Sequence, residues 1–426
     1  MSPMAGNQML LDESWRATPV DVYENLSCRL PAQQPVTGLI LSGGGARAAY
    51  QVGVLKGITS ILPDRQENPF PVIVGTSAGA INAVSLACSA MDFGTGVDNL
   101  LRVWRGFSSD KIYRSDWPGV LRQSLCFFFQ HMLGFGRDGG PPALLDNSPL
   151  RSLLLRELDF SGINLALARR KLAAVAVTAF SYHSAESITF YQARQRIEPW
   201  QRFRRSGRPA RLNIDHLSAS AAIPLIFPPV SVDNEFYGDG AVRQSAPISP
   251  ALHLGANRVL IISVNSQSAV PIYQSGSPSL AQIGSHLLNS TFSDHLETDL
   301  ELLQRLNHLG DILTPEQRKL EHGLSPVETL VISPSKNIDE IAVRHRKQMA
   351  AALRLFLRGS GATRANGGGV LSYLLFEQCY CNELIELGYR DALAEREKLL
   401  RFLLVAPAMS ESQRFRVAAA PAGAAR

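Results

Sequence analysis

A serine between glycines is the clearest candidate for chemistry in this chain. The sequence Gly-Thr-Ser-Ala-Gly at 75–79 follows an apolar run typical of a strand and precedes small residues with a helical pattern. A G-x-S-x-G turn between a strand and a helix holds its serine in a strained, exposed position, and Gly75 and Gly79 leave room for a substrate. The unpaired N–H groups of the helix N-terminus can stabilise a developing negative charge. The pattern therefore predicts Ser77 as a nucleophile.

A glycine loop lies upstream of this serine. The segment 37–42 is typical of a buried strand, and it runs into Gly43, Gly44 and Gly45, after which a helical pattern begins. A loop of this kind presents backbone N–H groups to an anion.

One carboxylate downstream is flanked by glycines. Asp239 lies between Gly238 and Gly240, shortly after the apolar and proline-rich segment 219–229. An Asp-Gly pair alone is typical of a turn. Its order after a glycine loop and a G-x-S-x-G turn makes Asp239 a candidate functional residue.

These three stretches together resemble the patatin-like phospholipases, over about residues 37–255. That family has a glycine-rich oxyanion loop, a G-x-S-x-G nucleophile turn and an Asp-Gly motif in this order, and the segment 219–229 resembles the one before its catalytic aspartate. The resemblance implies that Ser77 is the nucleophile and Asp239 the general base, with Gly240 as part of the motif. It implies a three-layer α/β/α fold for the catalytic domain.

The resemblance also assigns roles in the oxyanion loop. Gly43, Gly44 and Gly45 match its glycines, and Arg47 matches its basic position. The family usually has glycine where this chain has Ala48, and the added methyl group requires a negative φ or a local adjustment there.

A serine and an aspartate suffice for ester hydrolysis. A serine hydroxyl is a weak nucleophile until a base within hydrogen-bonding reach takes its proton. The pKa of an ordinary Asp is about 3.9, so burial of Asp239 would make it a better base. We expect Ser77 to attack an ester carbonyl, releasing an alcohol or lysolipid, and water activated by Asp239 to hydrolyse the acyl-enzyme. No metal and no organic cofactor are expected.

Other enzyme classes share parts of this pattern. An α/β-hydrolase also uses G-x-S-x-G but needs a late histidine, and an acyltransferase of the malonyl-carrier type has histidine before its serine, where this chain has Thr76. The glycine loop superficially fits a dinucleotide-binding motif, but the following strand lacks an acidic end. The histidines expected to be surface or packing residues are His216, His253, His286, His295, His308, His322 and His345.

Composition fits a globular enzyme without a membrane span. The chain has 426 residues, 45% of them hydrophobic, and no apolar run long enough to cross a bilayer. Its N-terminus shows no secretory signal, and its five cysteines favour reduced thiols, so we expect a cytoplasmic protein. Cys379 and Cys381 lack nearby partner ligands and are expected to pack rather than to bind a metal.

The net charge of +5 is unevenly distributed. The stretch 194–211 contains seven arginines with Trp200 and Phe203, and Glu198 is its only acidic residue. It is either a patch for peripheral contact with an anionic membrane or a solvated loop between two strands, and no specific nucleic acid is expected. The apolar segment 125–135 is too short to span a bilayer. It is either an acyl-binding lid or core packing.

The pattern changes after a last buried strand at 256–265. Helical periodicity dominates the C-terminal part, and the segments 371–377 and 384–392 resemble the C-terminal extension of bacterial cytoplasmic patatin-like proteins. We expect an N-terminal segment (1–36), an α/β catalytic domain (37–265), a linker (266–279), a mainly helical C-terminal extension (280–406) with a glycine-rich loop (360–369), and a disordered tail (407–426).

The expected function is a serine lipid acyl hydrolase. The resemblance implies phospholipid or lysophospholipid esters as substrates. A neutral-lipid esterase or an acyltransferase on the same site is the alternative within enzymes, and a catalytically silent lipid-binding protein is the alternative outside them. The sequence does not choose the headgroup, the acyl position, the chain length or the oligomeric state.

Overall fold

The computed structural model describes residues 35–114, 143–266, 289–290, 295–313, 326–351, 354 and 368–404. The tail and the segment 125–135, expected to be either a lid or core packing, lie outside these residues. So do nearly all of the N-terminal segment, of the predicted linker and of the predicted glycine-rich loop.

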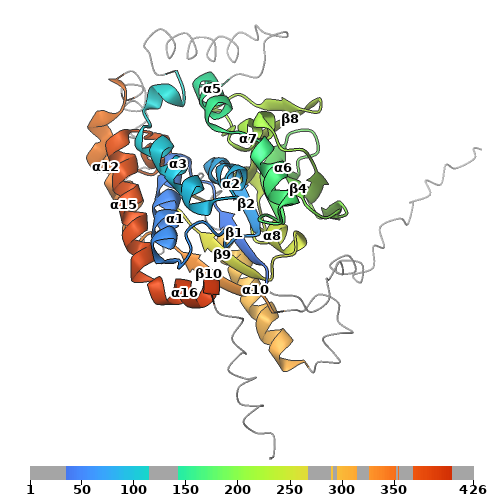
Figure 1. The fold of residues 1–426 in the computed structure, drawn as a ribbon. Coiled ribbons are helices and arrows are strands. Elements are labelled where there is room, and N and C mark those ends of the chain that lie inside the picture. The colour runs from blue at the N-terminus through green and yellow to red at the C-terminus, as the bar shows by residue number, and fades with distance from the viewer. Residues whose placement is uncertain are drawn as a thin grey trace, which may run out of the picture.

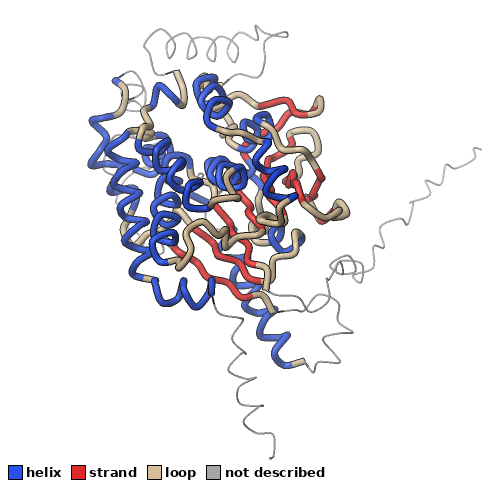
Figure 2. The backbone as a smooth tube through the Cα atoms, in the orientation of Figure 1, coloured by secondary structure: helices blue, strands red, loops and turns tan. Residues whose placement is uncertain are grey.

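The described residues form one ten-stranded mixed sheet, in the order β10-β9-β1-β2-β3-β4-β6-β5 (Figures 1 and 2). The strands from β10 to β3 are parallel, β4 is antiparallel to β3, and β8 branches off by pairing with the end of β3 and with β7. The strands are β1 (Thr37–Leu41), β2 (Val72–Thr76), β3 (Ala174–Ser181), β4 (Ser187–Ala193), β5 (Trp200–Arg202), β6 (Arg205–Pro209), β7 (Val230–Val232), β8 (Glu235–Asp239), β9 (Arg258–Ile262) and β10 (Glu328–Ile332).

Helices cover both faces of this sheet (Figure 2). The helices are α1 (Ala49–Ile61), α2 (Ala78–Cys88), α3 (Phe93–Arg105), α5 (Ser148–Glu157), α6 (Ser161–Ala168), α7 (Ile214–Ser220), α8 (Ser249–His253), α10 (His295–Ile312), α12 (Ile338–His345), α14 (Gly368–Leu374), α15 (Gln378–Ala394) and α16 (Arg396–Leu404). Short 3₁₀ helices are η3 (Gly45–Ala48), η4 (Ser109–Lys111), η5 (Gly240–Arg243) and η7 (Arg346–Gln348).

The central strands are buried on both faces, which explains their unbroken apolar sequences. In β1, Leu39 and Leu41 pack in the core with α1 and α2, whereas Ile40 packs in a second core with α8 and α10. Successive side chains of a strand point to opposite faces, so one short segment contributes to both cores. The predicted three-layer α/β/α fold is confirmed.

The C-terminal part is mainly helical, but it also contributes a strand to the catalytic sheet. β10 pairs in parallel with β9 and completes one edge. The helical expectation for 280–406 missed this strand, although its Thr329, Val331 and Ile332 are β-branched residues that favour strands.

α15 packs closely along α1, so that the red C-terminal helix lies beside the blue first helix in Figure 1. A Cβ added at Gly53 would lie 2.0 Å from the Ile385 carbonyl oxygen, and one added at Gly388 would lie 2.2 Å from that of Tyr50. With glycine at both positions, the backbones of α1 and α15 pack against each other without a steric clash. The C-terminal part is therefore docked on the helix that follows the glycine loop.

Candidate active site

Two side chains far apart in sequence meet at the end of the sheet. Ser77 Oγ donates a 2.5 Å hydrogen bond to Asp239 Oδ2, and both residues are buried, with exposed fractions of 2% and 0%. β3 sets their separation, because its Thr178 pairs with Thr76 in β2 and its Ala179 pairs with Asp239 in β8. Adjacent residues of one strand thus align Ser77 with Asp239.

The backbone at Ser77 has the geometry of a strained turn. Its φ of 57° and ψ of −131° lie in a region that is nearly restricted to glycine. Gly75 and Gly79 make the turn possible, because an added Cβ would lie 2.4 Å from the Gly79 carbonyl oxygen or 2.2 Å from that of Leu41, respectively. The motif glycines are thus required by packing.

Ser220 holds this turn in place. Its Oγ accepts a 2.9 Å hydrogen bond from the Ser77 N–H and donates a 2.6 Å hydrogen bond to the Thr178 carbonyl. The sequence analysis did not identify Ser220 as a functional residue. The one available signal was its place in the segment 219–229, which resembles the family sequence before the catalytic aspartate.

Asp239 has the environment of a base that works near neutral pH. Burial raises its pKa from 3.8 to about 7, against the opposing effect of hydrogen bonds from Ser77 and from the Ala241 N–H. Gly240 permits this arrangement, because a Cβ there would lie 2.0 Å from the Thr178 carbonyl oxygen. A base whose pKa lies near the working pH is efficient in proton transfer.

The glycine loop follows β1 beside the serine turn. Gly45 has φ of +55°, and a Cβ there would lie 2.3 Å from the Tyr373 carbonyl oxygen, while one at Gly44 would lie 2.4 Å from Val264 Cγ2. Ala48 has φ of −64°, which is the first of the two alternatives expected for it.

Buried polar side chains of α1, α2 and α3 support this loop through hydrogen bonds. The Gln51 side chain donates to the Ser42 carbonyl at 2.8 Å, and the Asn82 side chain donates to Gln51 Oε1 at 3.0 Å and to the Ala48 carbonyl at 3.2 Å. Trp104 Nε1 donates to Asn82 Oδ1 at 2.8 Å. The sequence analysis missed Gln51 and Asn82, which are polar residues at fully buried positions of mainly apolar helices.

Arg47 reaches the C-terminal part of the chain. Its guanidinium donates hydrogen bonds to Ser372, Asn265, Asn289 and Asp339. Among the hydrogen bonds of the described residues, none joins Arg47 to Ser77 or to Asp239.

A cleft at the carboxyl ends of the central strands adjoins the dyad. The space there that water-sized molecules can occupy is about 20 Å³, and Gly43, Thr76 and Ala241 are part of its wall. Gly43 lies in the glycine loop, Thr76 directly precedes Ser77, and Ala241 lies in the turn after Asp239. Its lining combines apolar and polar side chains, from Ile40, Ser42, Gln244, Pro247, Ile261, His295 and Leu296.

The described histidines do not complete a triad. His216 bonds with Asn213 at the start of α7, His253 stacks on Trp200, and His345 pairs with Glu383. No hydrogen bond joins a histidine of the described ranges to Ser77 or Asp239, and His286 and His322 lie outside those ranges. In the part of the chain that the structure covers, no group of three or more His, Cys, Asp or Glu side chains is placed to hold a metal ion.

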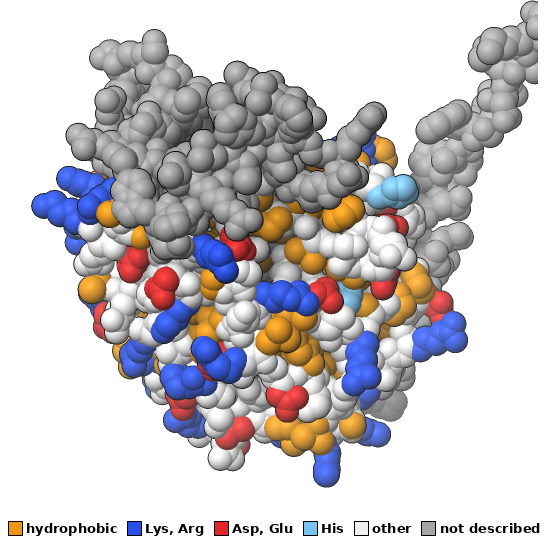
Figure 3. Space-filling view, turned by 90° about the horizontal axis from the view of Figure 1, so that it is seen from above, with side chains coloured by type: hydrophobic (Ala, Val, Ile, Leu, Met, Phe, Trp, Pro, Cys, Tyr) orange, Lys and Arg blue, Asp and Glu red, His pale blue; other side chains and the backbone are white. Residues whose placement is uncertain are grey.

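The arginine-rich stretch forms the β5–β6 hairpin at the sheet edge. Trp200 is buried between Tyr191 and His253, whereas Phe203 at the hairpin tip is 84% exposed. Basic, acidic and apolar side chains alternate over the described part of the face in Figure 3. No helix within the described residues is long and apolar enough to cross a membrane.

Comparison with known proteins identifies the family. The profile of the patatin-like phospholipases matches residues 39–252, just over half of the 426-residue chain. No curated protein matches this chain. The crystal structure of VipD from Legionella pneumophila is similar over 86% of this chain and 67% of that chain, at 11% identity and a TM-score of 0.31, which is too low to support an argument. By its family match, this chain belongs to the patatin-like phospholipases, a family of lipid acyl hydrolases.

Proposed function

We propose that this protein is a serine lipid acyl hydrolase in which Ser77 and Asp239 form the catalytic dyad. The observation that carries the proposal is the 2.5 Å hydrogen bond from Ser77 Oγ to a buried carboxylate whose pKa is raised to about 7. The strained backbone of Ser77 supports it, because such strain concentrates at functional sites.

The first half of the reaction is transfer of an acyl group to the serine. Asp239 takes the Ser77 proton as Oγ attacks the ester carbonyl, and the backbone N–H groups of Gly43, Gly44 and Gly45 stabilise the oxyanion. Collapse of the tetrahedral intermediate breaks the ester C–O bond, and Asp239 gives its proton to the leaving alcohol or lysolipid. Loss of one oxyanion donor typically lowers turnover about a hundredfold or more.

The second half releases the acyl group. Asp239 takes a proton from water as the water oxygen attacks the acyl-enzyme carbonyl, and it returns that proton to Ser77 Oγ as the fatty acid leaves. The same carboxylate therefore acts as base and acid in both halves.

The expected substrates are phospholipid or lysophospholipid esters. The family match supports a lipid substrate. For access to an anionic membrane we propose the β5–β6 hairpin, because its tip joins the exposed Phe203 to neighbouring arginines. The alternative reactions would use the same site: hydrolysis of a neutral-lipid ester, or transfer of the acyl group to another alcohol.

The test is fatty acid release from mixed phospholipid vesicles and hydrolysis of a short-chain chromogenic ester. We expect wild-type activity that Ser77→Ala and Asp239→Asn each abolish while the variants remain folded. Ser218→Ala is the matched control, because Ser218 is also buried and its hydroxyl has no hydrogen-bond partner in the described structure. Full activity in the dyad variants would refute the proposed site. A folded wild type that neither hydrolyses these substrates nor reacts with a fluorophosphonate would favour a lipid-binding protein.

A further inference from the structure

Arg47 is a buried cation at the join between the glycine loop and the C-terminal part of the chain. It lies in η3, two residues after Gly45, and its side chain is 4% exposed. An arginine in this position has to satisfy several N–H donors away from water, since an unpaired buried charge is strongly destabilising.

Four segments supply acceptors to this guanidinium. Nε donates to Ser372 Oγ at 2.8 Å, Nη1 donates to Asn265 Oδ1 at 2.7 Å, and Nη2 donates to Asp339 Oδ1 at 2.7 Å and to Asn289 Oδ1 at 3.3 Å. The Tyr373 ring covers the guanidinium, with its centroid 4.0 Å from Cζ. These contacts leave the guanidinium little capacity to serve a further acceptor at the dyad.

The acceptors are linked to each other. Ser372 Oγ lies 2.7 Å from Asp339 Oδ1, so α14 and α12 are joined beside the arginine. Backbone contact reinforces the join, because Gly45 lies directly against the Tyr373 carbonyl. The end of the glycine loop is therefore held between the guanidinium contacts and the backbone of α14.

A second buried contact fixes the following helix. Tyr50 in α1 donates to Asp391 Oδ2 in α15 at 3.0 Å, and Asp391 also accepts from the Ser335 N–H and hydroxyl at 2.9 Å and 2.6 Å. Asp391 thus joins α1, α15 and the segment after β10. Helix α1 cannot shift without breaking these bonds or the close packing at Gly53.

We propose that Asp339 and Ser372 are positioning residues that set the geometry of the oxyanion loop by acting through Arg47. The C-terminal part is then a component of the catalytic machinery rather than a cover for the flank of the domain. This inference rests on the proposed function, and it gives Arg47 a positioning role in place of direct charge on the oxyanion.

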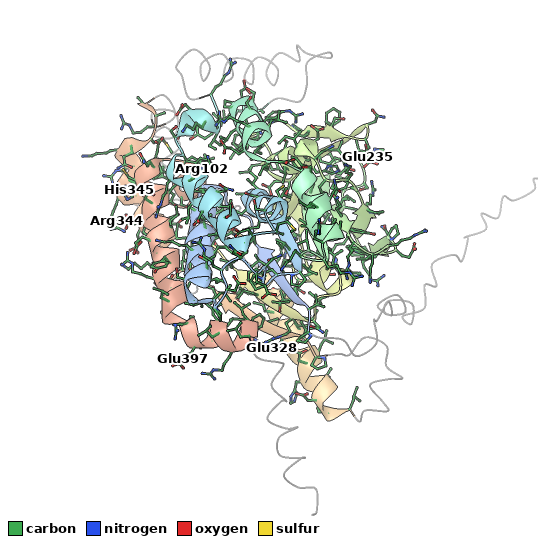
Figure 4. The ribbon with its side chains drawn as sticks, viewed as in Figure 1. Arg102, Glu235, Glu328, Arg344, His345 and Glu397 are labelled. Atoms are coloured by element: carbon green, nitrogen blue, oxygen red, sulfur yellow. The ribbon has the colours of Figure 1, made fainter. Side chains whose placement is uncertain are left out.

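The test separates the number of competent sites from the rate at each site. A fluorophosphonate labels Ser77, so the labelling amplitude counts competent sites and the labelling rate constant reports on the loop geometry at each site. The variants are Asp339→Asn, Ser372→Ala and Arg47→Lys. Arg344→Met is the control. Arg344 lies in α12, as Asp339 does, but it points outward (Figure 4) and makes a 2.6 Å ion pair with Glu383 of α15.

We expect Asp339→Asn to lower the labelling rate constant and kcat per labelled site roughly tenfold or more, with a small change in KM. Ser372→Ala removes one hydroxyl and is expected to lower both several-fold, which keeps the test valid if the first variant does not fold. Arg47→Lys should lower the labelling rate constant and kcat by as much as Asp339→Asn does, because one amine cannot serve four acceptors. In Arg344→Met the labelling rate constant and kcat should stay within about twofold of the wild-type values.

Four results would overturn the inference. A reduced amplitude with an unchanged rate per site in Asp339→Asn and Ser372→Ala would show a purely structural role. Near wild-type rates in Arg47→Lys would show that Arg47 acts by charge alone. A wild type without labelling or turnover would remove the proposed function and this inference with it, whereas normal rates in the variants beside an inactive Ser77→Ala would remove the inference alone.

Discussion

The raised pKa of Asp239 predicts that this carboxylate destabilises the folded protein at neutral and alkaline pH. Its pKa is about 7 in the fold against an ordinary value of 3.8. The interval corresponds to about 4 kcal/mol of differential interaction between the two protonation states. Asp239→Asn keeps the shape of the protonated carboxyl and removes the charge, so the variant should be more stable than the wild type at every pH at which the carboxyl of the unfolded wild type is ionised.

The sign and the pH window follow from proton linkage. Below pH 3.8, Asp239 is protonated in both the folded and unfolded chains, so wild type and variant have similar stability. Between pH 3.8 and about 7 the unfolded chain ionises first, and the folded state binds more protons, so the stability of the wild type falls with rising pH. Above pH 7 the deficit levels off at about 4 kcal/mol.

The assay is urea unfolding of the wild type and Asp239→Asn at pH 5 and at pH 8. We expect the variant to have the larger free energy of unfolding, by about 2 kcal/mol at pH 5 and about 4 kcal/mol at pH 8. Other titrating groups are common to both proteins and cancel in the difference. The reasoning would be refuted if the difference in free energy of unfolding did not grow from pH 5 to pH 8. It would also be refuted if the variant were less stable than the wild type at pH 8.

Further predictions concern activity, strain, positioning and packing. Hydrolysis of a chromogenic ester should rise with pH through about 7, as Asp239 ionises; a pH-independent rate from pH 5 to 9 would contradict its role as base. Ser77→Gly should be more stable than Ser77→Ala by roughly 1 kcal/mol in urea unfolding, because glycine relieves the positive φ. Ser220→Ala should destabilise the fold by about 1–3 kcal/mol and lower kcat, since it leaves the Ser77 N–H unpaired; unchanged kcat would count against its role. Gly388→Ala should cost more than about 2 kcal/mol, whereas Gly106→Ala, with its nearest neighbour at 3.4 Å, should cost less than half as much when both are unfolded in parallel.

The sequence alone determined the layer architecture and the local form of the site. The apolar runs at 37–42 and 256–265 predicted buried strands, and the resemblance to the patatin-like phospholipases implied the three-layer α/β/α fold. The nucleophile turn was predictable for a local reason, since a serine between Gly75 and Gly79 has room for a backbone that other sequences avoid.

Only the tertiary structure decided what lies around these elements. The pairing of β3 with both β2 and β8 brings Ser77 and Asp239 together, and register between distant strands leaves no local trace in a sequence. The partners of Arg47 lie more than two hundred residues away, so its link to the C-terminal part could not be predicted.

The pKa of Asp239 and the bracing roles of Ser220, Gln51 and Asn82 depend in the same way on packing. Burial and hydrogen-bond partners are properties of the assembled core, where removing water turns an ordinary carboxyl into a base near neutrality. The residue types needed for the chemistry were therefore evident from the chain. Their proton affinities and their exact supports arose only when distant segments packed together.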